Sequence, residues 1–509
     1  MTTIPTSWRW VPLDEVVAPD APIIYGILQP GPDVADGIPY VRPSEISGDE
    51  IRLDDLRRTT PEIARKYRRA SLEPGDVLLS IVGTIGKVAI VPPELRGANI
   101  TQSSCRIRPA SAVLHHAFLA WFLRSPVARS AYDETRLGTG VPRLNIGQVR
   151  EFPIALPPLN EQRRIVAKID ALMARSRRAK ESLDAIPPLL ERLRQSILAA
   201  AFRGDLTADW RAQNPDVEPA EKLLERIRTE RRRRWEEATL EKMHAKGKAP
   251  TGDGWKAKYE EPARANVEDL PILPTSWAYD RAEAIVDPDT VITYGIVLPK
   301  EHVETGVPYV RGQDIVDGEI LIDQLLRTHP DIAAKHSRSE LRGGDVLLCV
   351  IRHLKVAVVP SALEGGNLTQ GTVRMRPSFC VGSKYLAHYL AGPVAQSWMK
   401  QRYFGMDMPR INVEDARAIP VPVAPKLEQE EIARRVDALF ARVAEAESRY
   451  ATARVRESEL DRAILAKAFR GELVPQDPND EPAEQMLARL ANSEAPTKSK
   501  RGSPRQKDA

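Results

Sequence analysis

The feature that most constrains this chain is that nearly all of it is written twice. Pro-Thr-Ser-Trp stands at 5–8 and again at 274–277, and GIPYVRPSEI at 37–46 returns as GVPYVRGQDI at 306–315, so both pairs lie 269 residues apart. The order is kept to the pair AFRGDL at 201–206 and AFRGEL at 468–473. A period this long exceeds any solenoid repeat. The duplication predicts two similar domains and favours a target with two parts, although duplication can also leave two domains with no joint task.

Each copy has two parts of different character. The first part alternates short apolar runs such as GDVLLSIV with Gly and Pro, which predicts strands and turns, and 115–132 is typical of a helix. The second part spaces its seam residues alternately four and three apart, as a coiled coil does. In the first copy these are Ile165, Ile169, Leu172, Ser176, Ala179, Leu183, Ile186, Leu190, Leu193, Ile197 and Ala200; in the second they are Ile432, Val436, Leu439, Val443, Ala446, Tyr450, Ala453, Glu457, Leu460, Ile464 and Lys467.

Both long helices carry start and stop signals. Glu161 and Glu428 follow a proline and stand in the first turn, where the helix dipole favours an acid, and Gly204 and Gly471 end the helices. Pro187 and Pro188 must break or kink the first helix. Since an apolar seam needs a partner, we expect the two helices to pack as an antiparallel coiled coil with pseudo-twofold symmetry and one domain at each end.

The predicted fold class is therefore α+β, with two tandem mixed α/β domains that are each followed by a long helix. The expected boundaries are 1–158 for the first domain, 159–204 for its helix, 205–272 for a charged helical linker, 273–425 for the second domain, 426–473 for its helix and 474–509 for a C-terminal segment with a disordered tail. The linker contains four consecutive arginines, Arg231 to Arg234, but neighbouring glutamates favour an exposed linking helix over a nucleic-acid patch.

Composition and motifs argue against several classes of protein. No apolar run reaches the length of a membrane span, and no signal peptide precedes the first domain, so we expect a cytoplasmic protein. Three scattered cysteines support neither disulfides nor a zinc site. The Asn-Pro-Pro-aromatic motif of amino-methyltransferases, the acidic-x-Lys pair of metal-dependent nucleases, a phosphate-binding loop and an HExxH zinc motif are all absent. We expect no catalytic residue, no metal site and no cofactor in this chain.

The doubled domain, the helix starts PPLNEQRRI and PKLEQEEI and the closing AFRGDL and AFRGEL together resemble the DNA specificity subunit of type I restriction-modification systems. The resemblance implies that each domain is a target-recognition domain for half of a split, asymmetric site in double-stranded DNA, and that the helices set the gap. It also implies docking of two methyltransferase (modification) subunits and of restriction/translocase subunits, with S-adenosylmethionine, ATP and magnesium on those partners. Such a subunit is itself non-catalytic, in a host-defence complex with adenine-specific methyltransferase and nuclease activity.

Phosphate contacts position a protein on DNA, whereas contacts to base edges read the sequence. Residues shared by both copies should then hold the backbone or the fold, and differing loops should read bases. The candidate DNA-binding residues are Arg42, Lys87, Thr101, Gln102, Arg143 and Asn145 in the first copy and Arg311, Lys355, Thr369, Gln370, Arg410 and Asn412 in the second. For each of them a purely structural role, such as an ion pair made by Arg42 or Arg311, is an equal alternative. The candidate reading loops are 56–69, 136–143, 326–338 and 403–410.

Two other functions remain open at this stage. A self-contained restriction-modification enzyme would methylate or cut DNA as the purified chain. A structural coiled-coil protein would not bind DNA, so binding that weakens steeply with salt would exclude it.

Overall fold

The computed structural model describes residues 4–135, 142–247, 250 and 252–494. Its contacts divide the chain into two compact units, one made of residues 1–184 and 450–509 and the other of residues 185–449. Helix α14 (Lys426–Ala468) contributes to both units, because the boundary falls between Arg449 and Tyr450. Each unit thus combines a domain of one copy with helical residues of the other copy.

The first unit has a mixed α/β domain. Its strands are β1 (Arg9–Pro12), β2 (Ile24–Tyr25), β3 (Ile38–Val41), β4 (Ile46–Ser47), β5 (Glu50–Ile51), β6 (Arg57–Thr59), β7 (Val77–Ser80), β8 (Val88–Ile90), β9 (Asn99–Ile100), β10 (Ser104–Ile107) and β11 (Pro153–Leu156). Its helices are α1 (Pro61–Lys66), α2 (His116–Arg124), α3 (Pro126–Thr135), α4 (Ile146–Arg150) and α5 (Leu159–Asp184). The central sheet has the order β2-β10-β7-β8, a second sheet has the order β6-β3-β9, and β1 pairs with β11 so that the two ends of the domain meet.

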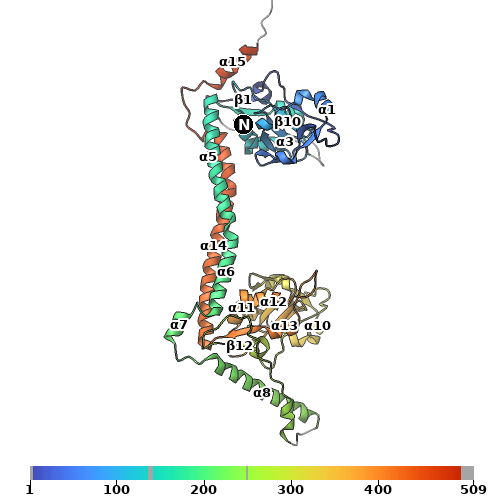
Figure 1. Ribbon diagram of the computed structural model, residues 1–509, viewed down its shortest axis with the longest axis vertical. Helices are drawn as coiled ribbons and strands as arrows, with labels where there is room; N and C mark the ends of the chain where they lie inside the picture. The colour runs from blue at the N-terminus through green and yellow to red at the C-terminus, as the bar shows by residue number, and fades with distance from the viewer. Residues whose placement is uncertain (1–3, 136–141, 248–249, 251, 495–509) are drawn as a thin grey trace, which may run out of the picture. The chain divides into compact units, whose positions relative to one another are not determined.

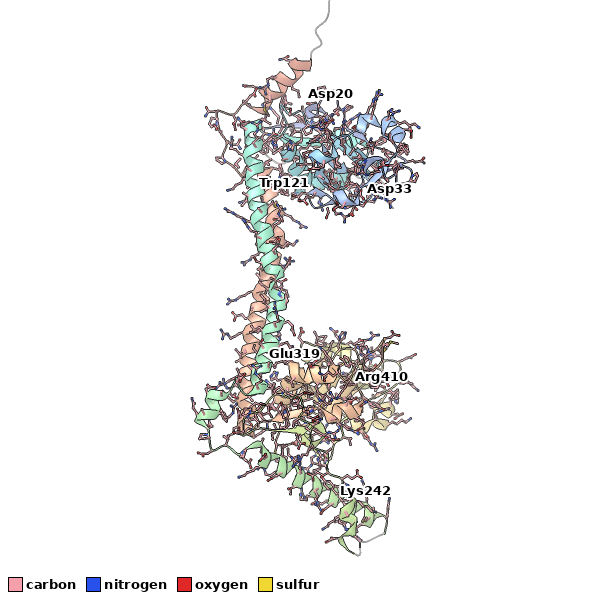
Figure 2. The ribbon with its side chains drawn as sticks, viewed as in Figure 1. Asp20, Asp33, Trp121, Lys242, Glu319 and Arg410 are labelled. Carbon is pink, nitrogen blue, oxygen red and sulfur yellow. The ribbon has the colours of Figure 1, made fainter. Side chains whose placement is uncertain are left out.

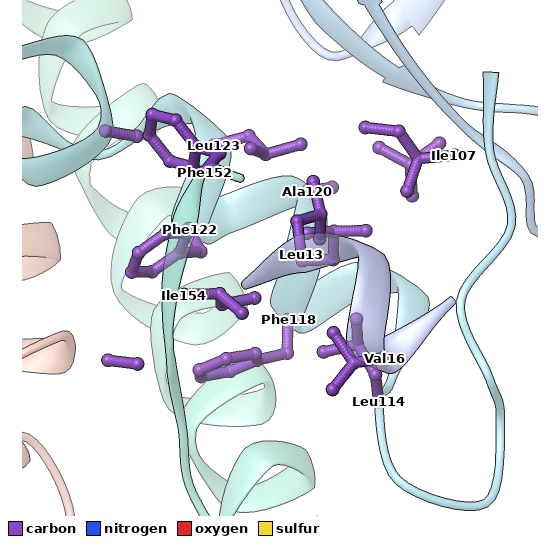
Figure 3. Packing of buried hydrophobic residues seen from close by; sticks show 14 of the residues in the cluster. Leu13, Val16, Ile107, Leu114, Phe118, Ala120, Phe122, Leu123, Phe152 and Ile154 are labelled. Carbon is purple, nitrogen blue, oxygen red and sulfur yellow. The ribbon is translucent and has the colours of Figure 1, made fainter. Parts of the chain in front are cut away.

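The core of the first unit lies between these sheets, α2 and the long helices. Figure 3 shows Phe118 and Phe122 of α2 packed near Ile154 of β11, and all three side chains are fully buried. The ring of Phe469, just after α14, lies 5.1 Å from the ring of Phe122 in an edge-on contact. The single helix predicted over 115–132 was wrong: Ser125 is extended, and Pro126 starts a new helix, a position that proline favours.

The second unit repeats this design with the other copy of the sequence. Its strands are β12 (Ala278–Arg281), β13 (Thr293–Tyr294), β14 (Val307–Val310), β15 (Ile315–Val316), β16 (Glu319–Ile320), β17 (Leu326–Thr328), β18 (Val346–Cys349), β19 (Val356–Val358), β20 (Asn367–Leu368), β21 (Thr372–Met375) and β22 (Pro420–Val423). Its helices are α6 (Ile186–Arg203), α7 (Ala208–Gln213), α8 (Ala220–Ala245), α9 (Ala282–Ile285), α10 (Pro330–Lys335), α11 (Ser383–Ala391), α12 (Pro393–Lys400) and α13 (Val413–Ala418). The last described helix, α15 (Ala483–Glu494), belongs to the first unit. The sheet orders β13-β21-β18-β19 and β17-β14-β20 match those of the first unit.

The break predicted at Pro187 and Pro188 is confirmed, because α5 ends at Asp184 and α6 begins at Ile186. The predicted stop at Gly204 is also confirmed: it caps α6 with φ +84°, and α14 ends just before Gly471, whose φ is +76°. The seam is less regular than expected, since Leu193 and Leu460 are 48% and 47% exposed.

Contacts between the long helices occur within each unit (Figure 1). In the first unit, Arg454 of α14 pairs with Asp184 at the end of α5 at 3.2 Å, while Ile165 and Ile464 belong to one buried cluster. In the second unit, Arg194 of α6 pairs with Glu447 of α14 at 2.8 Å. Trp121, labelled in Figure 2, reaches α5, where its indole N–H donates to Asp170 at 2.9 Å.

The two Glu-Gln pairs at the helix starts are buried junctions between helix and domain. In the first unit the Gln162 side-chain amide donates to the carbonyls of Val113 and Pro157, at 2.8 and 2.9 Å, and its oxygen accepts from the backbone N–H of His115 at 2.8 Å. Gln429 makes the same three kinds of bond in the second unit, to the carbonyls of residues 380 and 424 and to the N–H of Gly382. A glutamine at this position therefore ties each long helix to the loop before α2 or α11.

The glutamates of these pairs bind the segment that follows the other copy's helix. Glu161 accepts from the Gln476 amide at 2.5 Å, and burial raises the pKa of its carboxyl above the ordinary value. Glu428 is fully buried and accepts from Thr207, Arg211 and the Trp277 indole. Each copy's Pro-Thr-Ser-Trp also meets that segment, because the backbone N–H groups of residues 483 and 220 donate to the carbonyls of residues 7 and 276.

The four arginines of α8 have partners within the second unit. Arg231 donates to the carbonyls of Glu283 and Val286 at 2.7 and 2.9 Å, and the other three pair with acidic side chains, Arg233 with Glu230 at 2.7 Å among them. Among the described residues, these contacts leave little of the arginine charge unpaired, and α8 is not exposed all round because Leu223, Leu224 and Ile227 are buried.

Candidate nucleic-acid interface

The predicted residues of the first domain gather around one loop, residues 81–87, between β7 and β8. Arg143 forms a β-bridge with Val82. On either side of it, the N–H of Gly83 donates to the carbonyl of Pro142 at 2.9 Å, and the N–H of Leu144 donates to the carbonyl of Ile81 at 2.8 Å. The exposed Arg143 is therefore held beside the loop by backbone hydrogen bonds.

Lys87 stands at the other end of this loop. Its ammonium donates to the carbonyls of Pro43 and Ile46, at 2.8 and 3.0 Å, and it is only partly exposed. Arg42 lies next to the first of these carbonyls and pairs with the buried Glu45 at 2.7 Å. That hydrogen bond raises the pKa of Arg42 despite the opposing effect of burial. Both cations brace the domain, as the structural alternative expected.

Thr101 and Gln102 complete the cluster. The N–H of Thr101 donates at 3.2 Å to the carbonyl of Val41, the residue directly before Arg42. The N–H of Gln102 donates to the carbonyl of Ile27 at 2.9 Å. Thr101 is 8% exposed, whereas the Gln102 side chain is exposed. Of the two, only Gln102 offers its side chain freely to a ligand.

Asn145 has a clear local role that does not need DNA. It caps α4: its side chain accepts from the N–H of Gln148 at 2.9 Å, and the Gln148 side chain accepts from the N–H of Asn145 at 2.9 Å. Such a capping box satisfies two helix N–H groups that would otherwise lack partners. Asn412 caps α13 in the second unit by accepting from the N–H of Asp415 at 2.7 Å.

The second domain builds the same cluster from its own residues. Arg311 pairs with the buried Asp314 at 2.8 Å, and the Lys355 ammonium donates to the carbonyl of Ile315 at 2.7 Å. The N–H of Thr369 donates to the carbonyl of Val310 at 3.0 Å, which places Thr369 and the exposed Gln370 beside Arg311 as in the first unit.

Arg410 occupies the position of Arg143. It bridges Ile351, its side chain is exposed, and it is labelled in Figure 2 on the second unit. Its guanidinium lies 4.9 Å from the centre of the Phe404 ring, a cation–π contact that orients the charge.

The two clusters differ in the loop that they surround. The first copy has Gly-Thr-Ile-Gly at 83–86, whereas the second has Arg352 and His353, both exposed, and Arg352 adopts φ +63°. The loss of one residue between the copies marks this difference in the sequence, but the candidate residues named from the sequence did not include Arg352. A second omission is the tyrosine of the repeated Tyr-Gly-Ile, because Tyr25 and Tyr294 are 43% and 48% exposed.

Two of the predicted reading loops are wrong as loops. Residues 56–69 form β6, α1 and part of a 3-10 turn, and residues 326–338 form β17 and α10. Each helix starts with a proline after a capping residue, Thr60 or His329, a signal that the sequence interpretation overlooked. Residues 403–410 are a turn, and of 136–143 only residues 142 and 143 lie within the described part of the chain.

Among the residues that the structure describes, no cluster of three or more His, Cys, Asp or Glu side chains could hold a metal ion. Within the same residues, no helix combines the length and hydrophobicity that crossing a bilayer would need. A polar cavity of about 220 Å³ beside the Asp76–Arg108 ion pair is lined by His116 and Glu73 but by none of the predicted residues.

The chain is similar in sequence to known proteins. Residues 32–186 match the family model described as the type I restriction modification DNA specificity domain. The chain is 34% identical to the EcoBI specificity subunit of Escherichia coli over 45% of its own length and 49% of the relative, and 28% identical to the EcoDI specificity subunit of the same species over 70% of each. The first match thus spans about half of that relative's length.

Solved structures share the fold. The HsdS subunit from Thermoanaerobacter tengcongensis superposes with a TM-score of 0.55 at 22% identity, covering 92% of this chain and 98% of that one. A chain from a study of complex assembly and conformational transition of the type I R-M system gives a TM-score of 0.62 at 22% identity, covering 93% and 100%. At this identity the likeness shows the mixed α/β fold.

Proposed function

The chain is a relative of the type I restriction-modification specificity subunits, as the sequence predicted, and from this premise we propose that it is the DNA-reading subunit of such a system. In this proposal it binds double-stranded DNA, each domain recognises one half of a split and asymmetric site, and the chain itself catalyses no reaction.

One observation carries the proposal: the same face is built twice. In each domain an arginine, a lysine and a Thr-Gln pair, far apart in the sequence, lie around the loop between β7 and β8 or between β18 and β19. They are joined by equivalent hydrogen bonds to backbone carbonyls, which the lysine makes with its ammonium and the Thr-Gln pair with its backbone N–H groups. Shared cations suit the phosphates, which are the same at every site, whereas unlike loops suit different bases. A duplicated face with unlike centres is what a split, asymmetric DNA site requires.

The domains and helices are proposed as the sequence predicted them: target-recognition domains at 1–158 and 273–425, helices at 159–204 and 426–473, and a linker at 205–272. We infer that the helices form an antiparallel coiled coil, a spacer with pseudo-twofold symmetry. The exchanged contacts support this, since Phe469 packs on the first domain and Phe202 lies 5.2 Å from the rings of Tyr385 and Tyr389 in the second unit.

The partners are proposed from the family alone. Two modification subunits would dock on the repeated parts of this chain, and restriction subunits would join the larger assembly. S-adenosylmethionine, ATP and magnesium would be bound by those partners, which agrees with the absence of the corresponding motifs here.

A domain exchange tests the proposal. Replacing residues 1–158 with the matching domain of another specificity subunit should change one half of the methylated site and leave the other half unaltered. The sites are identified by sequencing methylated genomic DNA from cells that carry the chimera and its modification subunit. A chimera that changes both halves, or neither, contradicts the assignment of one half-site to each domain.

The spacer role has its own test. One heptad inserted into α5 and into the facing turn of α14, beside the Asp184–Arg454 ion pair, adds about 10 Å, or about three base pairs. We expect a longer gap between unchanged half-sites. Recovery of the original gap would contradict the spacer.

A further inference from the structure

The second unit presents an apolar turn beside the candidate DNA-facing cluster. Phe404 and Arg410 exchange backbone hydrogen bonds of 3.0 Å, which closes residues 404–410 into a narrow hairpin. Met406 at its tip is 101% exposed, and Phe404 and Met408 on either side are 42% and 47% exposed. A methionine exposed to this extent contributes nothing to the core, although exposing it to water is unfavourable.

The hairpin is held firmly. The N–H of Arg352 donates to the carbonyl of Pro409 at 2.7 Å, and Arg410 bridges Ile351, so the turn is fixed to the same loop that the predicted contacts surround. Gly405 is needed for the tight bend: its φ is +90°, and a Cβ there would lie 2.9 Å from the carbonyl oxygen of Met408. Because these contacts fix the hairpin before binding, its tip loses less conformational entropy when it binds a ligand.

Charge around the turn identifies the ligand. Arg352 and Arg410 are exposed at its base, and the exposed Arg402 lies 3.6 Å from the centre of the Trp398 ring. The acidic side chain of the hairpin is Asp407, next to the tip. An apolar tip with cations at its base fits a stack of base pairs flanked by phosphates, and proteins that kink DNA insert methionine or phenylalanine between base steps in this way.

We infer that Met406 is a wedge that enters between two adjacent base pairs of the half-site read by the second domain, while Arg352 and Arg410 hold the neighbouring phosphates. This rests on the proposed function and adds a site to it. Unstacking costs least at flexible pyrimidine–purine steps, so the wedge also selects the step that it enters. The corresponding sequence of the first copy, RLGTGVPR, has neither methionine nor phenylalanine, so the wedge belongs to the second half-site alone.

The test uses the chain purified with its modification subunits and duplexes selected by that assembly from a random-sequence pool. 2-Aminopurine, whose fluorescence rises on unstacking, is placed in turn at each position of the second half-site. Met406→Ala is compared with Met406→Leu, which keeps the apolar volume. Neither change disturbs a buried contact, so both variants should fold.

We expect Met406→Ala to bind the selected DNA about tenfold more weakly, with an unchanged slope of log affinity against log salt, and to lose the fluorescence rise seen with the unaltered chain. Met406→Leu should retain both the affinity and the fluorescence rise. Equal affinity and equal fluorescence for Met406→Ala would overturn the wedge. Failure of Met406→Ala to bind the modification subunits would also overturn it, because the turn would then be a protein contact. If the unaltered assembly selects no sequence, the proposed function itself fails, which is a different outcome from a neutral Met406.

Discussion

Replacing Gln162 with leucine removes the junction between α5 and the first domain while keeping a side chain of similar size. Gln162 is fully buried, and its amide satisfies three backbone groups: the carbonyls of Val113 and Pro157 and the N–H of His115. Leucine can bond to none of them, and no solvent reaches the site to replace the lost partner.

The expected cost follows from this count. A buried polar group left without a partner costs about 1–3 kcal/mol. Carbonyls tolerate the loss better than an N–H, and the leucine gains about 1–2 kcal/mol from its own burial. We expect Gln162→Leu to destabilise the first unit by about 3–5 kcal/mol, a large fraction of the stability of a typical domain.

Hydrogen exchange locates the effect. In the variant, the amide hydrogen of His115 should exchange faster by a factor of about 100 or more, in step with the loss of stability, while amides of the second unit keep their rates. Gln429→Leu should produce the mirrored result around Gly382. The control is Gln195→Leu, since the Gln195 amide donates to the exposed Glu191 of its own helix at 3.0 Å, and we expect a change below about 0.5 kcal/mol. Unchanged protection at His115 would refute the reasoning.

Three further predictions address charge and backbone geometry. Arg143→Gln should lower the slope of log affinity against log salt by about one for the selected DNA, measured by fluorescence anisotropy, and an unaltered slope would show that Arg143 contacts no phosphate. The hydrogen bond from Arg434, opposed by burial and aided by Arg435, lowers the pKa of Glu431 from 4.5 to about 2. The stability that this carboxylate contributes is therefore complete above pH 4.5 and is lost as the pH falls towards 2. Glu431→Gln should make the unfolding free energy depend less on pH in that window, and acid-unfolding curves equal to those of the unaltered chain would contradict this. Gly204→Ala should destabilise the second unit by more than Gly365→Ala. Both residues have positive φ, but a Cβ at Gly204 would clash with the ring of Pro274, whereas a Cβ at Gly365 would meet nothing within 4 Å. Equal urea midpoints for the two variants would contradict the clash.

The sequence was most informative where local chemistry decides the structure. Pro187 and Pro188 lack the N–H that a continuous helix needs, and Gly204 reaches a left-handed conformation at little cost, so a helix break and a helix end could both be placed. The seam was less predictable, because a spacing of four and three gives each position a direction but not the distance to a partner. Leu193 fits the pattern and is nevertheless half exposed.

At the candidate site, too, the sequence pattern did not give the contacts of the side chains. Repetition identified Lys87, but repetition cannot say where an ammonium points, and the carbonyls that it contacts belong to residues more than 40 positions away. Similarly, the role of Gln162 depends on carbonyls and an N–H of loops on another element. Met406 lies in the predicted reading loop 403–410, but a difference between the two copies cannot say which side chain of that loop is fully exposed.

These placements bear on how such a protein distinguishes sequences. Arg42 and Arg311 are paired with buried acids, and Lys87 and Lys355 are hydrogen-bonded to carbonyls, so the shared cations cannot move to follow a base without losing those bonds. A cation fixed in this way contributes equally at every sequence, because phosphates do not differ. Discrimination must therefore arise from side chains that the fold leaves unpaired and that the copies do not share. A substitution in the shared set should weaken binding to all sequences alike, and a substitution in the unshared turns should change which sequence is preferred.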